Sequence, residues 1–445
     1  MPTPGDLESS ELVYSCLKCL PGGRERWQEA SSVHTCLNHH GKYWWNTCGY
    51  ILAVLLQCSG YSYLTQTKAL YLFTQVVAPN LGNAREPGAR LWESFMTDDH
   101  TPIELSWDWH EGDQKPTIRF SMEAVGAAAG SPDDPFNFKT FESFKVNIFK
   151  GLSETDLLWF HHLDKLLGRT PAQISEEGHR SRIFWAFDLD DAAITTKAYF
   201  LPIWQATATG RNSLQVITEA IASGPQNTLE RLRGYDLFVQ FHDSYCEPQL
   251  KIEMLGIDLV SPEKSRFKIY FRNRDTSFRS VVGTMTLGGR IKGVSMDKSL
   301  QKLKKLFSAL FEQNFGLDCG NLPLNNHRTA GILYNVEFNL RGQPPAIKIY
   351  IPVRHYASND AQVLRAVSEF VASQTPARGG KGTLNTSELS PYAGAMFEIF
   401  DENALNESLG VHTYIGCSIK ESGSLRVVSY LNPQESKLRR SSKGA

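Results

Sequence analysis

The sequence predicts an α/β (α+β) fold in which ten antiparallel strands close into a β-barrel that is surrounded by helices. One observation is that a helical pattern and a pair of strand-like runs alternate five times along the 445 residues. Another is a basic residue, a spacer and a tyrosine inside strand-like runs, in Lys197-Ala-Tyr199, Lys268-Ile-Tyr270 and Lys348-Ile-Tyr350. Related runs hold Arg119 and Tyr430, so the motif returns every 71 to 82 residues. Such a period is typical of a repeated supersecondary unit.

The first two helix–hairpin units follow from hydrophobic periodicity and turn residues. Residues 43–77 carry an apolar helical stripe with a break at Ser59-Gly60, and residues 137–167 repeat the helical pattern. Strands are expected at 102–111 and 117–125, joined by the turn-rich stretch 112–116. A second hairpin is expected at 183–189 and 193–201, joined through Asp190-Asp191.

The remaining three units repeat this order. Residues 213–235 are predicted to be helical and to precede strands at 250–259 and 265–272. Residues 296–314 form a helix with one apolar face, made of Leu300, Leu303, Phe307, Leu310 and Phe311. Strands follow at 332–340 and 346–352, then helices at 361–374 and 393–403, then strands at 412–420 and 424–431.

Closing the five hairpins into one barrel satisfies every strand edge. Each hairpin turns one face to a common interior and the other to its helices, and ten strands surround a space wide enough for a ligand. A parallel eight-stranded barrel does not fit, because the helices separate hairpins and not single strands. The lysine and tyrosine of each repeated motif share a strand face. The pattern therefore predicts a polyanion site walled by aromatic rings.

Because a closed barrel of this length can be one unit, we expect a single domain over residues 1–445, with flexible segments at the N-terminus, 375–388 and 433–445. A hydrophobic content of 41% is typical of a globular protein. A net charge of −1 argues against nucleic acid or an acidic membrane as a partner. No apolar stretch approaches the roughly 20 residues of a membrane span, and the N-terminus lacks signal-peptide features. We expect a cytoplasmic monomer or homodimer.

The eight cysteines are scattered, which favours free thiols in a reducing compartment. Cys16 and Cys19, followed by Cys36 and His39, have a spacing close to that of a zinc ribbon. The alternative is packing, since Leu12, Cys16, Cys19 and Leu20 fall on one helical face. We favour packing and predict no metal site and no cofactor.

Several short stretches carry a family resemblance when taken in order. They are Trp44-Trp45, CSGYS at 58–62 with Gln66, VVAPNLG at 76–82, PIELSW at 102–107, the repeated strands and the tyrosine-bearing last hairpin. Together they resemble the fungal dimethylallyltryptophan synthase family of aromatic prenyltransferases, over about residues 40–431. The resemblance implies the prenyltransferase ABBA barrel. It also implies transfer of a dimethylallyl group from dimethylallyl diphosphate to an aromatic ring in fungal secondary metabolism. The usual acceptor is an indole, in tryptophan, a cyclic dipeptide or a related alkaloid.

This chemistry accounts for the repeated residue types. Clustered cations stabilise a departing diphosphate without a metal, and the candidates are Arg119, Lys197, Arg266, Lys268, Lys348 and Lys420. Tyrosine rings shield an allylic cation from water and also border the diphosphate. The candidates are Tyr199, Tyr270, Tyr350, Tyr414 and Tyr430. Unpaired buried lysines are costly, so we expect an anionic ligand to fill the lysine face. By resemblance, Glu104 is the catalytic residue that accepts a hydrogen bond from the indole N–H.

The sequence also departs from the family pattern. The stretch 183–187 has no lysine where members that alkylate tryptophan can carry a candidate base, and Lys420 stands where the family has an arginine. Asp98-Asp99 and Asp190-Asp191 lack the third aspartate of the magnesium-binding DDxxD pattern. Because the candidate base is missing, a tyrosine, a quinone or a polyketide phenol is the alternative acceptor. A non-catalytic barrel for a hydrophobic ligand and a nucleic-acid-binding barrel that stacks bases on tyrosines are the alternative function classes.

Overall fold

The computed structural model describes residues 22–33, 37–85, 91–110, 114–151, 155–168, 179–191, 193–224, 228–245, 248–313, 320–323, 325–374, 390–420 and 422–439. Cys16, Cys19 and Cys36 of the zinc-like spacing lie outside these residues, as does the predicted linker at 375–388. The zinc hypothesis and the flexible linker therefore stay predictions.

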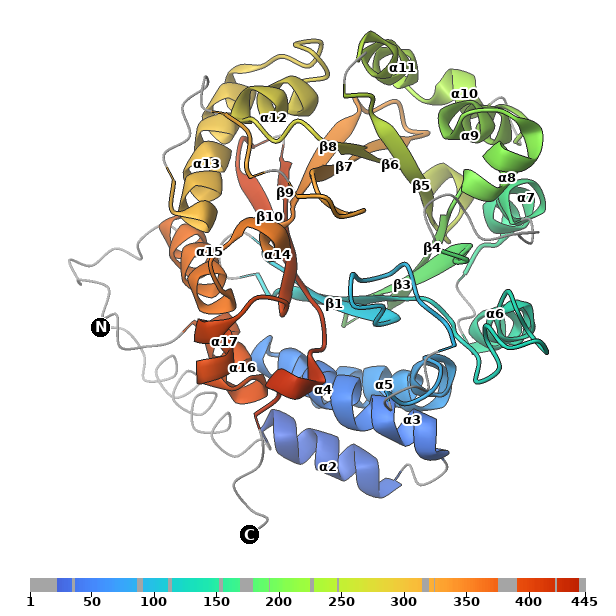
Figure 1. Ribbon diagram of the computed structural model, residues 1–445, viewed down its shortest axis with the longest axis vertical. Helices are drawn as coiled ribbons and strands as arrows, with labels where there is room; N and C mark the ends of the chain where they lie inside the picture. The colour runs from blue at the N-terminus through green and yellow to red at the C-terminus, as the bar shows by residue number, and fades with distance from the viewer. Residues whose placement is uncertain are drawn as a thin grey trace, which may run out of the picture.

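Ten antiparallel strands close into one barrel, as predicted (Figure 1). The strands are β1 (Ile103–Asp108), β2 (Thr117–Met122), β3 (Ile183–Leu189), β4 (Ile194–Phe200), β5 (Lys251–Asp258), β6 (Arg266–Asn273), β7 (Ile332–Asn339), β8 (Ala346–Ile351), β9 (His412–Ile419) and β10 (Leu425–Leu431). Each strand pairs with its neighbours in sequence, and β1 pairs with β10 to complete the circle. The barrel therefore has no free strand edge.

Strand β2 illustrates why these sequences form a barrel wall. Ile118, Phe120 and Met122 are almost fully buried against the surrounding helices, whereas Arg119 and Ser121 between them line the interior. Side chains alternate across a strand, so one face joins the core and the other faces the cavity. The hydrophobic core thus lies between the barrel and its helices, and the polar residues lie inside the barrel.

Helices ring the outside of the barrel in chain order (Figure 1). They are α2 (Gly23–Val33), α3 (His39–Trp44), α4 (Tyr50–Cys58) and α5 (Tyr63–Leu72); α6 (Phe138–Gly151) and α7 (Leu158–Leu167); α8 (Ile203–Thr209), α9 (Ser213–Ala222), α10 (Thr228–Arg231) and α11 (Tyr235–Ser244); α12 (Phe278–Met285), α13 (Val294–Phe311) and α14 (Val353–Tyr356); and α15 (Asp360–Gln374), α16 (Pro391–Ile399) and α17 (Glu402–Glu407). None of the described helices is long and apolar enough to cross a membrane.

Helix boundaries differ from the prediction where polar caps interrupt an apolar pattern. Ser62 accepts a hydrogen bond from the Thr65 N–H and begins α5, and Asp401 caps α17 in the middle of the helix predicted at 393–403. The short helices α8, α12 and α14 were missed, because each supplies too few turns for a clear periodicity.

Two β-bulges change which residues face the interior. The β5–β6 register shifts at Glu253, and the β9–β10 register shifts so that Thr413 and Tyr414 together oppose Tyr430. As a result, adjacent residues on one strand line the cavity, both in the pair Glu253 and Met254 and in the pair Thr413 and Tyr414. Bulges of this kind re-aim side chains next to functional sites.

Candidate active site

The barrel surrounds a cavity of about 380 Å³ that is lined by all of the predicted site residues. All six predicted cations line it, as do Glu104 and all five predicted tyrosines. Glu104 lies near the start of β1, close to the loops at that end of the barrel. Because neighbouring strands are antiparallel, Arg266 at the start of β6 and Lys420 after the end of β9 lie at the opposite end, and Lys197 lies in the middle of β4. The structure therefore brings together residues from 104 to 430 that the sequence analysis assigned to one site.

Carboxylates accompany the cations, which the sequence analysis did not predict. Asp188 Oδ2 lies 2.5 Å from Lys197 Nζ, and Asp258 Oδ1 lies 2.8 Å from Lys268 Nζ. Arg266 Nε lies 2.5 Å from the other oxygen of Asp258. The protein therefore supplies counterions to Lys197 and Lys268, and the expected anionic ligand at the lysine face stays a prediction.

Two arginines share a further buried carboxylate. Asp108 is fully buried and pairs with Arg119, and it accepts hydrogen bonds from Nε and Nη2 of Arg426. Arg119 Nε also lies 3.0 Å from Asp188, although the angle does not make a hydrogen bond. Arg426 was missed by sequence reasoning, although it lies on the same strand face as Tyr430 and lines the cavity.

These pairs determine the charge states of the cluster. Burial lowers the pKa of Lys197 to about 8, against the opposing attraction of Asp188. Burial would raise the pKa of Asp258, but Lys268, Lys197 and Arg266 outweigh it and hold the pKa below its usual value. The carboxylates therefore stay ionised, and the cluster consists of real ion pairs at neutral pH.

Lys348 differs from its neighbours. Its Nζ donates a 2.7 Å hydrogen bond to the Tyr430 hydroxyl and lies 4.7 Å and 5.0 Å from the ring centres of Tyr350 and Tyr430. Among the described residues no carboxylate forms an ion pair with it. Burial lowers its pKa well below the usual value. Lys420 follows the end of β9 and lines the same cavity.

The five tyrosines form a connected wall across the cavity. Ring centres are 5.7 Å apart for Tyr199 and Tyr270, 5.8 Å for Tyr270 and Tyr350, and 5.5 Å for Tyr350 and Tyr430. Tyr414 meets Tyr350 edge-on at 6.3 Å. Burial raises the pKa of Tyr414 to about 12 and those of Tyr199, Tyr350 and Tyr430 well above the usual value. These phenols therefore stay neutral.

Two glycines leave room for this wall. A Cβ on Gly256 would lie 2.8 Å from the Tyr199 ring, and a Cβ on Gly416 would lie 2.7 Å from the Lys348 side chain. Both positions face the interior between the rings, so a larger residue would displace the tyrosine or the lysine. Sequence reasoning missed both glycines, because nothing in the local pattern marks a close approach from a neighbouring strand.

Glu104 lies on the cavity face of β1, beyond the tyrosines. Its Oε1 accepts a 2.6 Å hydrogen bond from the Thr413 hydroxyl. Enclosure raises the pKa of Glu104 to about 7, and the negative charge of Asp98 adds to this, while Thr413, Arg354 and Lys348 act in the opposite direction. A carboxyl group with this pKa can accept a proton or a hydrogen bond near neutral pH.

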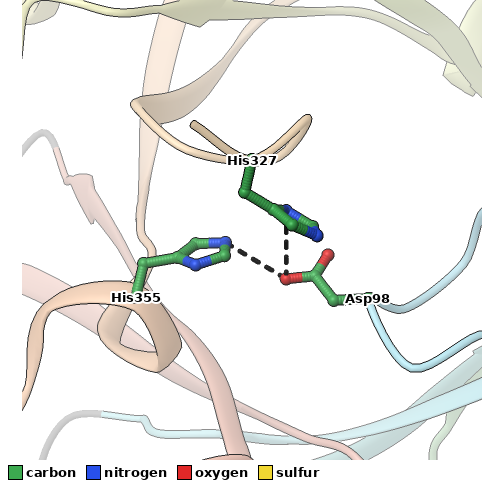
Figure 2. A group of neighbouring side chains, drawn as sticks. All are labelled: Asp98, His327 and His355. Atoms are coloured by element: carbon green, nitrogen blue, oxygen red, sulfur yellow. Dashed lines mark ion pairs between the residues drawn. The ribbon is translucent and has the colours of Figure 1, made fainter. Parts of the chain in front are cut away.

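Asp98 and His327, which lie in loops, come close to His355 of α14 (Figure 2). They lie at the end of the barrel where the charge of Asp98 acts on Glu104. Asp98 Oδ2 lies 3.1 Å from His355 Nε2 and 3.8 Å from His327 Nδ1, a combination of side chains that could hold a metal ion. The Thr329 hydroxyl contacts all three side chains, at 2.7 to 2.9 Å, and Arg354 Nε lies 3.4 Å from Asp98. The group is therefore already tied together by hydrogen bonds and ion pairs.

Two further arginines lie at the same end. Arg328 donates from Nη2 to the Thr97 carbonyl, and its guanidinium carbon lies 4.1 Å from the Phe95 ring centre. Arg328 and Arg354 line the cavity, and each has a buried Nη1 that finds no hydrogen-bond partner in the described part of the chain. By contrast, Arg272 is held by Glu253 and the Thr329 carbonyl.

The family model described as "Tryptophan dimethylallyltransferase" matches residues 40–383. The chain is 33% identical over 405 residues to 4-O-dimethylallyl-L-tyrosine synthase of Claviceps purpurea, covering 89% of this chain and 88% of that one. It is 31% identical over 412 residues to 7-dimethylallyltryptophan synthase of Aspergillus fumigatus, covering 88% and 84%.

Solved structures share the fold at lower identity. AnaPT from Neosartorya fischeri superposes with a TM-score of 0.76 at 24% identity, over 92% of this chain and 98% of that one. NotF, in a complex with brevianamide F and DMSPP, superposes with a TM-score of 0.73 at 23% identity, with the same coverage. At this level of identity, the likeness concerns the barrel and its helices.

Proposed function

Since the chain belongs to the tryptophan dimethylallyltransferase family and is an aromatic prenyltransferase, we propose that it transfers a dimethylallyl group from dimethylallyl diphosphate to an indole-containing acceptor. The observation that carries this proposal is the order of groups along one enclosed cavity. Cations lie at one end, five tyrosine rings lie in the middle, and Glu104 lies at the other end. Diphosphate, allylic cation and aromatic ring need these environments in this order.

The cation end would bind and stabilise the diphosphate. When the carbon–oxygen bond breaks, the electron pair leaves with the diphosphate, and Arg119, Lys197 and Lys268, which line the cavity, would stabilise that charge. Fixed protein charges would do the work that a metal ion does in other prenyl-transferring enzymes. We therefore propose that the reaction requires no metal.

The tyrosine wall would protect the cation. The rings of Tyr270, Tyr350 and Tyr430 are in contact, and an aromatic face attracts a positive charge. Neutral phenols also avoid trapping the cation, and the closed wall limits access by water. The aromatic acceptor would attack the cation from the side that Glu104 occupies.

Glu104 would accept the hydrogen bond of the indole N–H. The bond increases electron density in the ring as the new carbon–carbon bond forms, and the alkylated ring then loses a proton to become aromatic again. A pKa of about 7 leaves a large share of Glu104 ionised at neutral pH. Thr413 orients the carboxylate from β9.

The opposite end favours an acceptor with a free carboxylate. Arg328 and Arg354 each have a buried Nη1 without a partner in the described residues, and a carboxylate accepts two such hydrogen bonds. A free aromatic amino acid supplies this group, which supports tryptophan over a cyclic dipeptide. The relative at 33% identity is named for L-tyrosine, so a tyrosine phenol is the second candidate acceptor.

A panel of acceptors tests the proposal. The purified enzyme is incubated with dimethylallyl diphosphate and L-tryptophan, a tryptophan-containing cyclic dipeptide or L-tyrosine, and products are measured by mass spectrometry. We expect the largest turnover with tryptophan. Faster prenylation of tyrosine would move the assignment to a phenolic acceptor, and no prenylated product with any arene would contradict the proposal.

A further inference from the structure

Charges of opposite sign alternate around the cation end of the barrel. The first strand of each of four hairpins supplies a carboxylate, and the even-numbered strands supply the cations. The carboxylates are Asp108 on β1, Asp188 on β3, Asp258 on β5 and Glu337 on β7; the cations are Arg119 on β2, Lys197 on β4, Arg266 and Lys268 on β6, Lys348 on β8 and Arg426 on β10. Cross-strand register sets Arg119 beside Asp188, Lys197 beside Asp258 and Lys268 beside Glu337.

The alternation is broken at β9. Ser418 occupies the position between Lys348 and Arg426, where the pattern calls for a carboxylate. Lys420 adds a further cation two residues later, on the same strand face. Among the described residues of this pattern, basic side chains therefore outnumber carboxylates around β8, β9 and β10, whereas the two kinds are equal in number around β3 to β7.

We propose that Asp258 and Glu337 are internal counterions that oppose diphosphate binding and promote its release, and that Ser418 marks the gap where the diphosphate is not opposed. The proposal rests on the proposed function, since it concerns the same diphosphate site. Both carboxylates act through Arg266, and Asp258 also acts through Lys268, so both are positioning residues.

The contacts at Arg266 support this role. Its Nε lies 2.5 Å from Asp258 Oδ2 and its Nη1 lies 3.4 Å from both oxygens of Glu337, while the side chain is 37% exposed. A guanidinium that is held between two carboxylates is already in place when the site is empty, so little reorganisation is needed on binding. Negative charge on the same carboxylates would repel a bound diphosphate.

Repulsion by the carboxylates would promote the release of inorganic diphosphate after the reaction. The product carries more negative charge than the esterified substrate, so cations without internal counterions would hold the product more tightly than the substrate. Carboxylates that partly neutralise the cations would weaken the binding of both substrate and product. Because the pattern has no carboxylate at Ser418, the diphosphate would not be repelled on that side of the site.

Calorimetric titration with inorganic diphosphate tests the proposal through variants of opposite expected effect. Asp258→Asn and Glu337→Gln keep shape and remove the opposing charge, so we expect about tenfold tighter binding and stronger product inhibition by diphosphate. Ser418→Asp completes the alternation, and we expect at least about tenfold weaker binding than in Ser418→Asn, its neutral match of similar size. Glu263→Gln, which removes an exposed carboxylate paired with Arg231, is the surface control.

The outcomes separate this proposal from the proposed function. If the parent enzyme does not bind diphosphate, the diphosphate site itself is wrong and both proposals fall. If the parent binds it but Asp258→Asn and Glu337→Gln bind it equally or more weakly, the counterion proposal alone is overturned. Equal binding by Ser418→Asp and Ser418→Asn also overturns it. If Asp258→Asn does not fold, Glu337→Gln and the two Ser418 variants still decide, because Glu337 and Ser418 are less buried than Asp258.

Discussion

The Thr413 hydroxyl reaches Glu104 across an intervening strand and donates a 2.6 Å hydrogen bond to its Oε1. Glu104 lies on β1 and Thr413 lies on β9, with β10 between them. The contact is possible because the β9 bulge turns Thr413 into the cavity beside Tyr414. One irregularity in the barrel wall thus sets the environment of the carboxyl group that we assign to the acceptor.

Glu104→Gln tests that assignment. Glutamine keeps the shape but removes the negative charge that strengthens the bond to an indole N–H, so we expect turnover to fall by roughly 10² or more. Binding of dimethylallyl diphosphate, measured by calorimetry, should be nearly unchanged, because Glu104 lies away from the cation end. An N-methylated indole should react poorly with the parent enzyme for the same reason. Comparable rates on N–H and N-methyl acceptors would contradict this role for Glu104.

The pH dependence of the reaction should report Glu104. Its pKa is raised to about 7 and the ionised form accepts the hydrogen bond, so kcat/KM for the acceptor is expected to rise with pH through about 7. Asp98 raises this pKa and Thr413 lowers it. Asp98→Asn should therefore move the midpoint to lower pH and Thr413→Val to higher pH. Parallel shifts, or none, in the two pH profiles would exclude Glu104 as the titrating group.

Replacing Lys197 or Lys268 with alanine should lower turnover by roughly 10², the scale of one preorganised charge contact. Because both lysines form ion pairs, replacing either one should also lower the free energy of unfolding, which the sequence did not predict. Lys268→Ala leaves Asp258 short of a partner, and breaking a buried pair in this way costs about 3 kcal/mol. Urea unfolding should show that adding Asp258→Asn to Lys268→Ala restores stability but not turnover. Equal stability of the single and double variants would contradict the coupling.

The roles of the Tyr430 ring and of its hydroxyl can be tested separately. Tyr430→Phe keeps the ring beside Tyr350 but removes the hydroxyl that accepts a bond from Lys348, so the rate should fall while the product stays the prenylated acceptor. Tyr430→Ala opens the wall to water, so a larger share of dimethylallyl diphosphate should end as dimethylallyl alcohol. Chromatography of both products measures the ratio. An unchanged ratio in the alanine variant would show that the ring does not shield the cation.

Chelation tests the absence of a metal requirement. Fixed cations such as Arg119 and Lys197 line the diphosphate end, so we expect turnover to survive an excess of EDTA. Stimulation by added calcium or magnesium is compatible with this result, since divalent ions also pair with diphosphate in solution. Complete loss of turnover in EDTA, restored by magnesium, would contradict it.

The sequence predicted the barrel because its strands are regular. In β2, alternation of Ile118 and Phe120 with Arg119 and Ser121 fixes both the strand and its inward face, and the same logic located the repeated lysine–tyrosine pairs. The alternation of inward and outward side chains is interrupted at a β-bulge, so the inward position of Thr413 beside Tyr414 was not predicted.

The charge balance of the site was harder to predict. Asp188 lies one residue before the end of β3 and Asp258 ends β5, and the sequence analysis located both strands correctly. Their partners lie on neighbouring strands and become visible only when the register is known. His327 lies in a loop and His355 lies in α14, and the two come together with Asp98 only in the folded barrel. Local sequence patterns carry no information about contacts between residues that are distant in sequence.

Pairing of β1 with β10 makes closure of the barrel the last possible event in synthesis. When β1 leaves the ribosome, one of its two neighbours does not yet exist, and a row of its backbone N–H and C=O groups has no strand to bind. Contacts this distant in sequence make folding slow, and an open strand edge can pair with another chain in the meantime. Deleting residues 425–431 would therefore produce an open, aggregation-prone sheet rather than a smaller barrel.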